Sequence, residues 1–126
     1  MSKGYIALGV CALLLAATGL WAVGTFSGGR SGEYDAFAQC LAEKQITMYG
    51  AAWCPHCLRE KSRFGSSFRF VPYVECPEKP QVCTAAGVTG YPTWIFPDGR
   101  KFEGEQGLEN LSELSGCLLP VQGTVQ

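Results

Sequence analysis

The feature that most constrains the fold of this chain is a closely spaced pair of cysteines, Cys54 and Cys57, between a strand-like and a helix-like stretch. Residues 46–49 predict a short strand ending at Gly50, and residues 58–64 predict a helix. The first cysteine is therefore expected at a helix N-terminus, where free backbone N–H groups and the helix dipole stabilise a thiolate. The thiolate is the form of cysteine that attacks disulfides. The pattern predicts a reactive dithiol, with the second cysteine one turn into the helix and able to close a disulfide with the first.

The two residues between these cysteines fit the same interpretation. Pro55 suits the first helical turn, where the missing N–H costs nothing. His56 is the only histidine of the chain, and a protonated imidazole there would favour the Cys54 thiolate. Stabilising the thiolate stabilises the reduced form, which makes the disulfide a stronger oxidant. The alternative is that His56 is a solvent-exposed residue without a role.

The rest of the chain predicts further helices and strands in alternation. Strands separated by helices imply a parallel pair, and a strand hairpin adds an antiparallel pair. We therefore expect an α/β fold with a small mixed four-stranded sheet flanked by helices. The further predicted helices cover residues 33–44, 80–86 and 108–117, and the further strands cover residues 70–75, 93–96 and 101–103.

A second motif lies before the strand predicted at residues 93–96. Tyr91-Pro92 precedes it within the string Gly-Val-Thr-Gly-Tyr-Pro-Thr. A proline at a strand start often has no special role, but an aromatic residue before proline tolerates a cis bond, which is usually a tight structural feature. We expect the cis form.

Together, Trp-Cys-x-x-Cys after a strand and Gly-Val-x-Gly-Tyr-Pro-Thr before a hairpin resemble the thioredoxin superfamily, over about residues 33–117. The resemblance implies a trimmed thioredoxin-like fold that lacks the usual first strand. It also implies that Tyr91 and Pro92 lie against the dithiol and bind the substrate, and Trp53 is a further candidate contact. The family's buried acidic residue before the dithiol is replaced here by Met48, so proton transfer from Cys57 must use another group or water.

A finer resemblance is to the thioredoxin-like domain that partners vitamin K epoxide reductase homologues. It rests on matches that run from the first predicted helix to the strand after Pro92. It implies a domain that takes electrons from cysteine-containing secreted proteins and passes them to a quinone-linked membrane reductase. That reductase would be a separate partner of this chain. The matching segments are residues 37–41, 48–50, 53–57, 73–76, Cys83 and 90–94.

Four further cysteines follow residue 26, at positions 40, 76, 83 and 117. Many pairings are conceivable, and only the family resemblance and the helix positions favour Cys76 with Cys83 and Cys40 with Cys117. The Cys40–Cys117 bridge is expected to be structural, whereas Cys76–Cys83 is either structural or a second redox pair. A four-cysteine zinc site is disfavoured because the last spacing is wrong. We expect no metal.

The N-terminal segment, residues 1–26, is interpreted as a membrane anchor or signal segment. No charged side chain occurs between Gly4 and Gly29, and about 22 apolar residues suffice to span a bilayer as a helix. We favour an uncleaved single-pass transmembrane helix over a cleaved signal peptide. Residues 27–32 read as a Gly/Ser linker, 33–119 as the domain and 120–126 as a flexible tail. The even number of cysteines after the segment suits an oxidising compartment, the periplasm or another lumen outside the cytoplasm.

The function predicted from these features is a thiol–disulfide oxidoreductase that oxidises the dithiols of secreted proteins. A formal net charge of -1 excludes an electrostatic nucleic-acid binder, and a single histidine excludes a His-rich metal site. We expect a monomer with no cofactor other than its redox-active disulfide. Two alternatives stay open: a reductase fed by a membrane electron donor, and a module that holds a soft metal such as Cu(I) through the dithiol.

Overall fold

The computed structural model describes residues 32–121, which form a four-stranded sheet with helices packed on it. The strands are β1 (Thr47–Gly50), β2 (Tyr73–Glu75), β3 (Thr93–Ile95) and β4 (Lys101–Glu103), in the spatial order β2-β1-β3-β4. β1 and β2 are parallel, whereas β1–β3 and β3–β4 are antiparallel. The mixed four-stranded sheet expected from the sequence is therefore confirmed.

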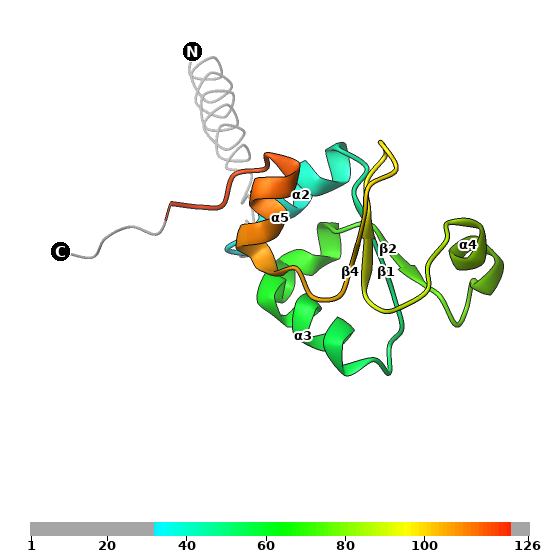
Figure 1. Ribbon diagram of the computed structural model, residues 1–126. Coiled ribbons are helices and arrows are strands. Elements are labelled where there is room, and N and C mark those ends of the chain that lie inside the picture. The colour runs from blue at the N-terminus through cyan, green and yellow to red at the C-terminus, as the bar shows by residue number, and fades with distance from the viewer. Residues whose placement is uncertain (1–31, 122–126) are drawn as a thin grey trace, which may run out of the picture.

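The helices are α2 (Asp35–Glu43), α3 (Pro55–Phe64), α4 (Pro80–Ala85) and α5 (Gly107–Ser115). Figure 1 shows α2, α3 and α5 together on one side of the sheet and the short α4 on the other. The structure has an α/β fold whose helices are distributed unevenly between the two faces of the sheet. The dithiol segment lies between β1 and α3, as the sequence predicts.

The segment after α3 differs from the sequence-based prediction. Gly65, at φ 55°, ends α3, and residues Gly65–Phe70 form a 3-10 helix, η1. η1 is held against the start of α2 because the backbone N–H of Tyr34 donates to the buried Ser67 hydroxyl at 3.0 Å. The predicted strand at 70–75 therefore begins only at Tyr73, after Pro72.

The core lies between the sheet and the three helices on one side. Trp94 of β3 is fully buried and packs against Phe64 of α3, with ring centroids 6.1 Å apart. Phe64 in turn stacks on Phe37 of α2 at 5.8 Å. Successive side chains of a strand point to opposite faces of the sheet. Accordingly, Met48 and Gly50 of β1 are buried on the core side. The alternate residues, Thr47 and Tyr49, are half-buried.

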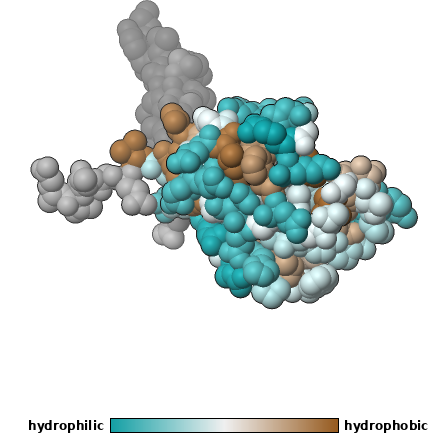
Figure 2. All heavy atoms as spheres, in the orientation of Figure 1, coloured by the Kyte–Doolittle hydropathy of each residue, from teal (hydrophilic) through white to brown (hydrophobic). Residues whose placement is uncertain are grey.

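The outer surface is mostly polar. Figure 2 shows hydrophilic residues over most of the face on view, with hydrophobic residues in smaller patches. Leu118 and Val121, which follow the end of α5, are the large apolar side chains of the described residues with the highest exposed fractions, 85% and 95%. Within residues 32–121, no helix has the length and apolar character needed to cross a bilayer. The predicted anchor at residues 1–26 lies outside the described residues.

The described residues contain two disulfides. Cys40 of α2 is bonded to Cys117, just after α5, and their Cα atoms are 5.8 Å apart. Cys76, after β2, is bonded to Cys83 of α4, with Cα atoms 5.7 Å apart. Of these four cysteines, Cys76, Cys83 and Cys117 are buried and Cys40 is half-buried. The pairing is the one favoured from the family resemblance.

We predict that the two disulfides stabilise the fold unequally because the loops they close differ in length. In the chain-entropy description, the Cys40–Cys117 bridge contributes about 4.5 kcal/mol and the Cys76–Cys83 bridge about 2.5 kcal/mol. Urea unfolding of Cys40→Ala/Cys117→Ala and of Cys76→Ala/Cys83→Ala should show the larger loss of unfolding free energy for the first pair. A larger loss for the second pair would contradict this account.

Candidate active site around Cys54 and Cys57

Cys54 is the residue that precedes the first turn of α3. Its backbone is extended (φ -77°, ψ 119°), and Pro55 occupies the first helical position, as expected from the sequence. The Cys54 sulfur accepts a hydrogen bond from the backbone N–H of Cys57 at 3.4 Å. A negative charge on this sulfur would therefore lie at the helix N-terminus, where a free N–H group and the helix dipole stabilise it.

The two sulfurs of the motif differ in their surroundings. Both cysteines are free thiols, but Cys57 is fully buried and Cys54 is 4% exposed. Burial is the main cause that raises the pKa of Cys57 to about 11. Little of the Cys54 surface reaches solvent in this reduced form. Of the two cysteines, only Cys54 has any surface exposed to solvent, so an incoming sulfur meets Cys54 first.

The Tyr91-Pro92 motif lies directly against the Cys54–Cys57 motif. The Tyr91-Pro92 peptide bond is cis, as predicted, and the Cys54 thiol donates to the carbonyl oxygen of Tyr91 at 3.7 Å. Tyr91 is half-buried, so part of it can contact a bound chain. Pro92 was expected to bind the substrate, but its ring is fully buried and its carbonyl accepts from Gly104 N–H at 2.7 Å. Of this pair, only Tyr91 offers a contact surface.

The rim of the site is apolar. Trp53 is 68% exposed and meets the Tyr91 ring edge-on at a centroid distance of 6.1 Å. Leu58, on the first turns of α3, is 52% exposed. Large apolar side chains left in solvent beside a reactive sulfur are suited to contact a polypeptide substrate. Trp94, by contrast, is a core residue.

His56 is exposed, and its contacts are with charged side chains. Its Nδ1 atom lies 2.8 Å from Glu105 Oε1 and 2.7 Å from the Arg59 guanidinium. Nδ1 donates to Glu105 only when it carries a proton, and accepts from Arg59 only when it does not. The hydrogen bonds from His56 and Arg59 lower the pKa of Glu105 to about 2, and the charges of Arg59 and Arg63 act in the same direction. Glu105 was not singled out from the sequence.

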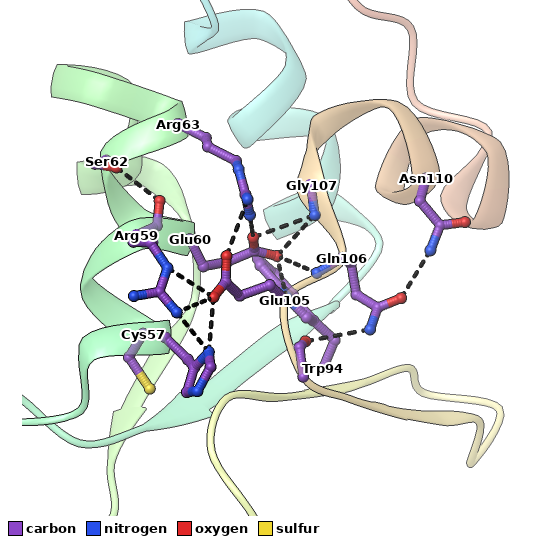
Figure 3. Close-up of polar contacts among 12 residues, drawn as sticks. Cys57, Arg59, Glu60, Ser62, Arg63, Trp94, Glu105, Gln106, Gly107 and Asn110 are labelled. Carbon is purple, nitrogen blue, oxygen red and sulfur yellow. Dashed lines mark hydrogen bonds and ion pairs between the residues drawn. The ribbon is translucent and has the colours of Figure 1, made fainter.

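Glu60 is the other residue that sequence reasoning missed. It is fully buried on α3 and accepts from Trp94 Nε1 at 2.9 Å, Gln106 N–H at 2.9 Å and Gly107 N–H at 3.1 Å, besides an ion pair with Arg63. Figure 3 shows these groups converging between α3 and the start of α5. The signal in the sequence is its place between Cys57 and Phe64, on the buried face of the helix.

The other four cysteines of residues 32–121 are paired in disulfides, so they are not free to join the dithiol in a metal site. Cys76 and Cys83 are bonded to each other, so they do not provide the thiolates that a four-cysteine zinc site would need. Within the described part of the chain, no three His, Cys, Asp or Glu residues are grouped so that they could hold a metal ion. The arrangement offers thiol chemistry at one pair of sulfurs.

Comparisons with known proteins give partial matches. The chain is 37% identical over 93 residues to the thiol-disulfide oxidoreductase LTO1 of Arabidopsis thaliana, which covers 67% of this chain and 24% of that protein. It is 33% identical over 123 residues to protein disulfide isomerase-like 2-2 of Oryza sativa subsp. japonica, covering 81% of this chain and 32% of that protein. The chain thus spans less than a third of the length of these curated relatives. No family model matches it.

Among solved structures, the oxidised thioredoxin of Plasmodium falciparum aligns with a TM-score of 0.44 and 18% sequence identity. The alignment covers 64% of this chain and 86% of that one.

We predict that Glu105 makes the free energy of unfolding fall more steeply as the pH is lowered. Its pKa is about 2 in the fold and ordinarily 4.5, so its stabilising effect is complete above about pH 4.5 and is lost as pH falls towards about 2. Glu105→Gln removes this contribution, and its unfolding free energy should fall less over that window than that of the native chain. The measurement is urea unfolding at a series of pH values, with the exposed Glu113→Gln as a matched control. Equal acid sensitivity of the native chain and Glu105→Gln would refute the assignment.

Proposed function

We propose that this chain is a thiol–disulfide oxidoreductase that oxidises dithiols of secreted proteins through Cys54 and Cys57. The observation that carries the proposal is the pair of free thiols at the start of α3, one of which contacts both the helix N-terminus and the carbonyl of Tyr91. A sulfur in that position is stabilised as the leaving group in thiol–disulfide exchange. The relatives named thiol-disulfide oxidoreductase and protein disulfide isomerase-like support the same activity.

The reaction begins from the oxidised form, in which Cys54 and Cys57 share a disulfide. A client thiolate attacks Cys54 Sγ and forms a mixed disulfide, while the broken bond's electron pair goes to Cys57, which takes up a proton. The second client thiolate attacks the client sulfur of the mixed disulfide, and Cys54 leaves as a thiolate. The client gains a disulfide, and the protein is left with two electrons on its reduced pair, the state in which both cysteines are free.

The groups around the pair have distinct tasks in this scheme. Trp53 and Tyr91 provide the accessible apolar surface that a client chain would contact. Pro55 begins the helix whose N-terminus supports Cys54. His56 adds positive charge near the helix start when it is protonated, and Glu105 and Arg59 hold its ring. A positive imidazolium there favours the Cys54 thiolate and hence a more oxidising disulfide.

The compartment and the electron acceptor belong to the proposal as well. We place the domain outside the cytoplasm, in the periplasm or another lumen, since two disulfides within the described residues suit an oxidising compartment. Residues 1–26 would anchor it as a single membrane-spanning helix. The electrons would pass to a quinone-linked membrane reductase of the vitamin K epoxide reductase type. Cys76–Cys83 is assigned a structural role here.

Replacing Cys57 by Ala should trap client proteins on Cys54, because no internal thiol remains to release the mixed disulfide. Given secreted proteins that carry disulfides, the Cys54 thiolate should attack one client sulfur while the other client sulfur leaves as a thiolate. We expect the resulting mixed disulfides to be visible on non-reducing gels and to disappear on reduction. Mass spectrometry should identify Cys54 as the attachment site. Cys54→Ala/Cys57→Ala is the matched control and should trap nothing. Absence of any adduct in Cys57→Ala would contradict the proposed role of Cys54.

The reduction potential of the Cys54/Cys57 pair decides the direction of electron flow. An oxidant should equilibrate with glutathione at a potential of about -120 to -200 mV. A value near about -270 mV would instead identify a thioredoxin-like reductase that receives electrons from a membrane donor. The measurement uses the full-length chain with Cys11→Ser, so that the cysteine outside the described residues does not contribute.

A further inference from the structure

The buried thiol of Cys57 needs a route for its proton. In the proposed function, on which this inference rests, Cys57 gains a proton when the disulfide opens and loses it when the disulfide forms again. Its side chain is fully buried, and burial disfavours the thiolate. Met48, which lies on the neighbouring strand β1 six residues before Cys54, carries no ionisable group. Another group must exchange this proton.

The Cys57 sulfur and the Tyr73 hydroxyl both border a small gap that the missing side chain leaves at Gly50. A Cβ atom at Gly50 would lie 2.8 Å from Cys57 Sγ and 3.3 Å from the hydroxyl oxygen of Tyr73. The missing side chain therefore leaves the thiol and the phenol on two sides of one small space. Tyr73 lies beside Met48 in the register of β2 on β1, so the neighbouring strand supplies the polar group that β1 lacks.

The Tyr73 hydroxyl is connected to a carboxylate that reaches solvent. It donates to Glu75 Oε2 at 2.5 Å, and Glu75 Oε1 accepts from the backbone N–H of Ala52 at 2.8 Å. Glu75 is half-exposed, so a proton on its carboxyl can pass to water. Burial and the neighbouring Glu75 raise the pKa of Tyr73, which keeps the phenol protonated as the middle member of the chain.

The other charged groups near Cys57 are less suitable. Both oxygens of Glu60 are occupied by donors from Trp94, Arg63 and the start of α5, and its hydrogen bonds do not involve Cys57. Lys61, one turn beyond Cys57, has its Nζ 3.5 Å from the centroid of the Tyr73 ring and is a cation. The other titratable groups near Cys57 are Cys54 and Tyr73, and Glu75 is hydrogen-bonded to Tyr73.

We propose that Tyr73 and Glu75 form a proton relay for Cys57. When the disulfide re-forms, the Cys57 thiol passes its proton across the Gly50 gap to the Tyr73 oxygen while the Tyr73 proton moves to Glu75 Oε2. This leaves a Cys57 thiolate, a neutral tyrosine and a protonated Glu75. The thiolate attacks Cys54 Sγ in the mixed disulfide that Cys54 forms with the electron-accepting partner, and the partner's sulfur leaves as a thiolate. When a client opens the disulfide, the same two transfers run in reverse, and Cys57 leaves with a proton.

The test is the reaction of the reduced full-length chain, in a Cys11→Ser background, with dithiobis(nitrobenzoate), followed by stopped-flow absorbance. Attack by Cys54 releases the first nitrothiobenzoate at a rate that depends on reagent concentration. Attack by Cys57 on the mixed disulfide then releases the second nitrothiobenzoate at a rate that is independent of the reagent concentration. Only the second phase requires the Cys57 proton to leave.

In Tyr73→Phe and Glu75→Gln we expect the second phase to slow at least about tenfold near pH 7, a conservative figure beside the roughly 10²–10⁴-fold typical of general acid–base catalysis. Its rate should also rise more steeply with pH than in the native chain. A purely electrostatic role predicts the opposite for Glu75→Gln, because removing a negative charge favours the Cys57 thiolate and speeds the second phase. The first phase should be unchanged in both variants.

Tyr49→Phe and Glu78→Gln are the matched controls. Tyr49 is on the opposite face of the sheet and Glu78 is exposed, so neither should alter the second phase. A second phase that is unchanged or faster in Glu75→Gln overturns the relay, and this variant alone decides if Tyr73→Phe does not fold. A native chain that releases only the first nitrothiobenzoate would instead overturn the proposed function.

Discussion

The arrangement of the site depends on one buried carboxylate. Glu60 is fully buried, and a buried charge is tolerated only when hydrogen bonds and an opposite charge replace the lost water. Its partners come from β3, through Trp94, from the start of α5, through Gly107, and from α3 itself, through Arg63. This carboxylate therefore fixes the rotation of α3 on the sheet. Because Cys54 precedes the first turn of α3, the same contacts hold the reactive sulfur against the Tyr91 carbonyl.

The two sulfurs meet opposite environments although only two residues separate them. Cys54 faces the helix N-terminus, the Tyr91 carbonyl and the apolar rim that includes Trp53. Cys57 faces inward, towards β1 and β2, where polar groups are few. A sulfur that exchanges with clients must be reachable, and a sulfur that closes the disulfide must be kept from competing thiols. Because one turn of helix separates the two positions, each sulfur meets its own requirement.

Much of the fold and the centre of the site could be predicted from the sequence. The strand–Cys54–Cys57–helix order and the cis Tyr91-Pro92 bond depend on local patterns, and the structure contains both. Glu60 was not predicted, because the identity of its partners is set by how α3, β3 and α5 pack. η1 was missed for a similar reason, since its contact with Tyr34 joins residues that are distant in the chain. Residue patterns reveal local geometry, whereas tertiary contacts decide which polar groups are buried.

The Cys40–Cys117 bond lies close to both limits of the described chain, with all four strands and the dithiol between its two cysteines. Tension applied along the polypeptide from outside this pair passes through a covalent bond and bypasses the sheet. The strands, whose hydrogen bonds would otherwise be sheared apart, carry little of that load. A domain pulled at two points that both lie outside the bridged pair would thus keep its two sulfurs in place under mechanical stress.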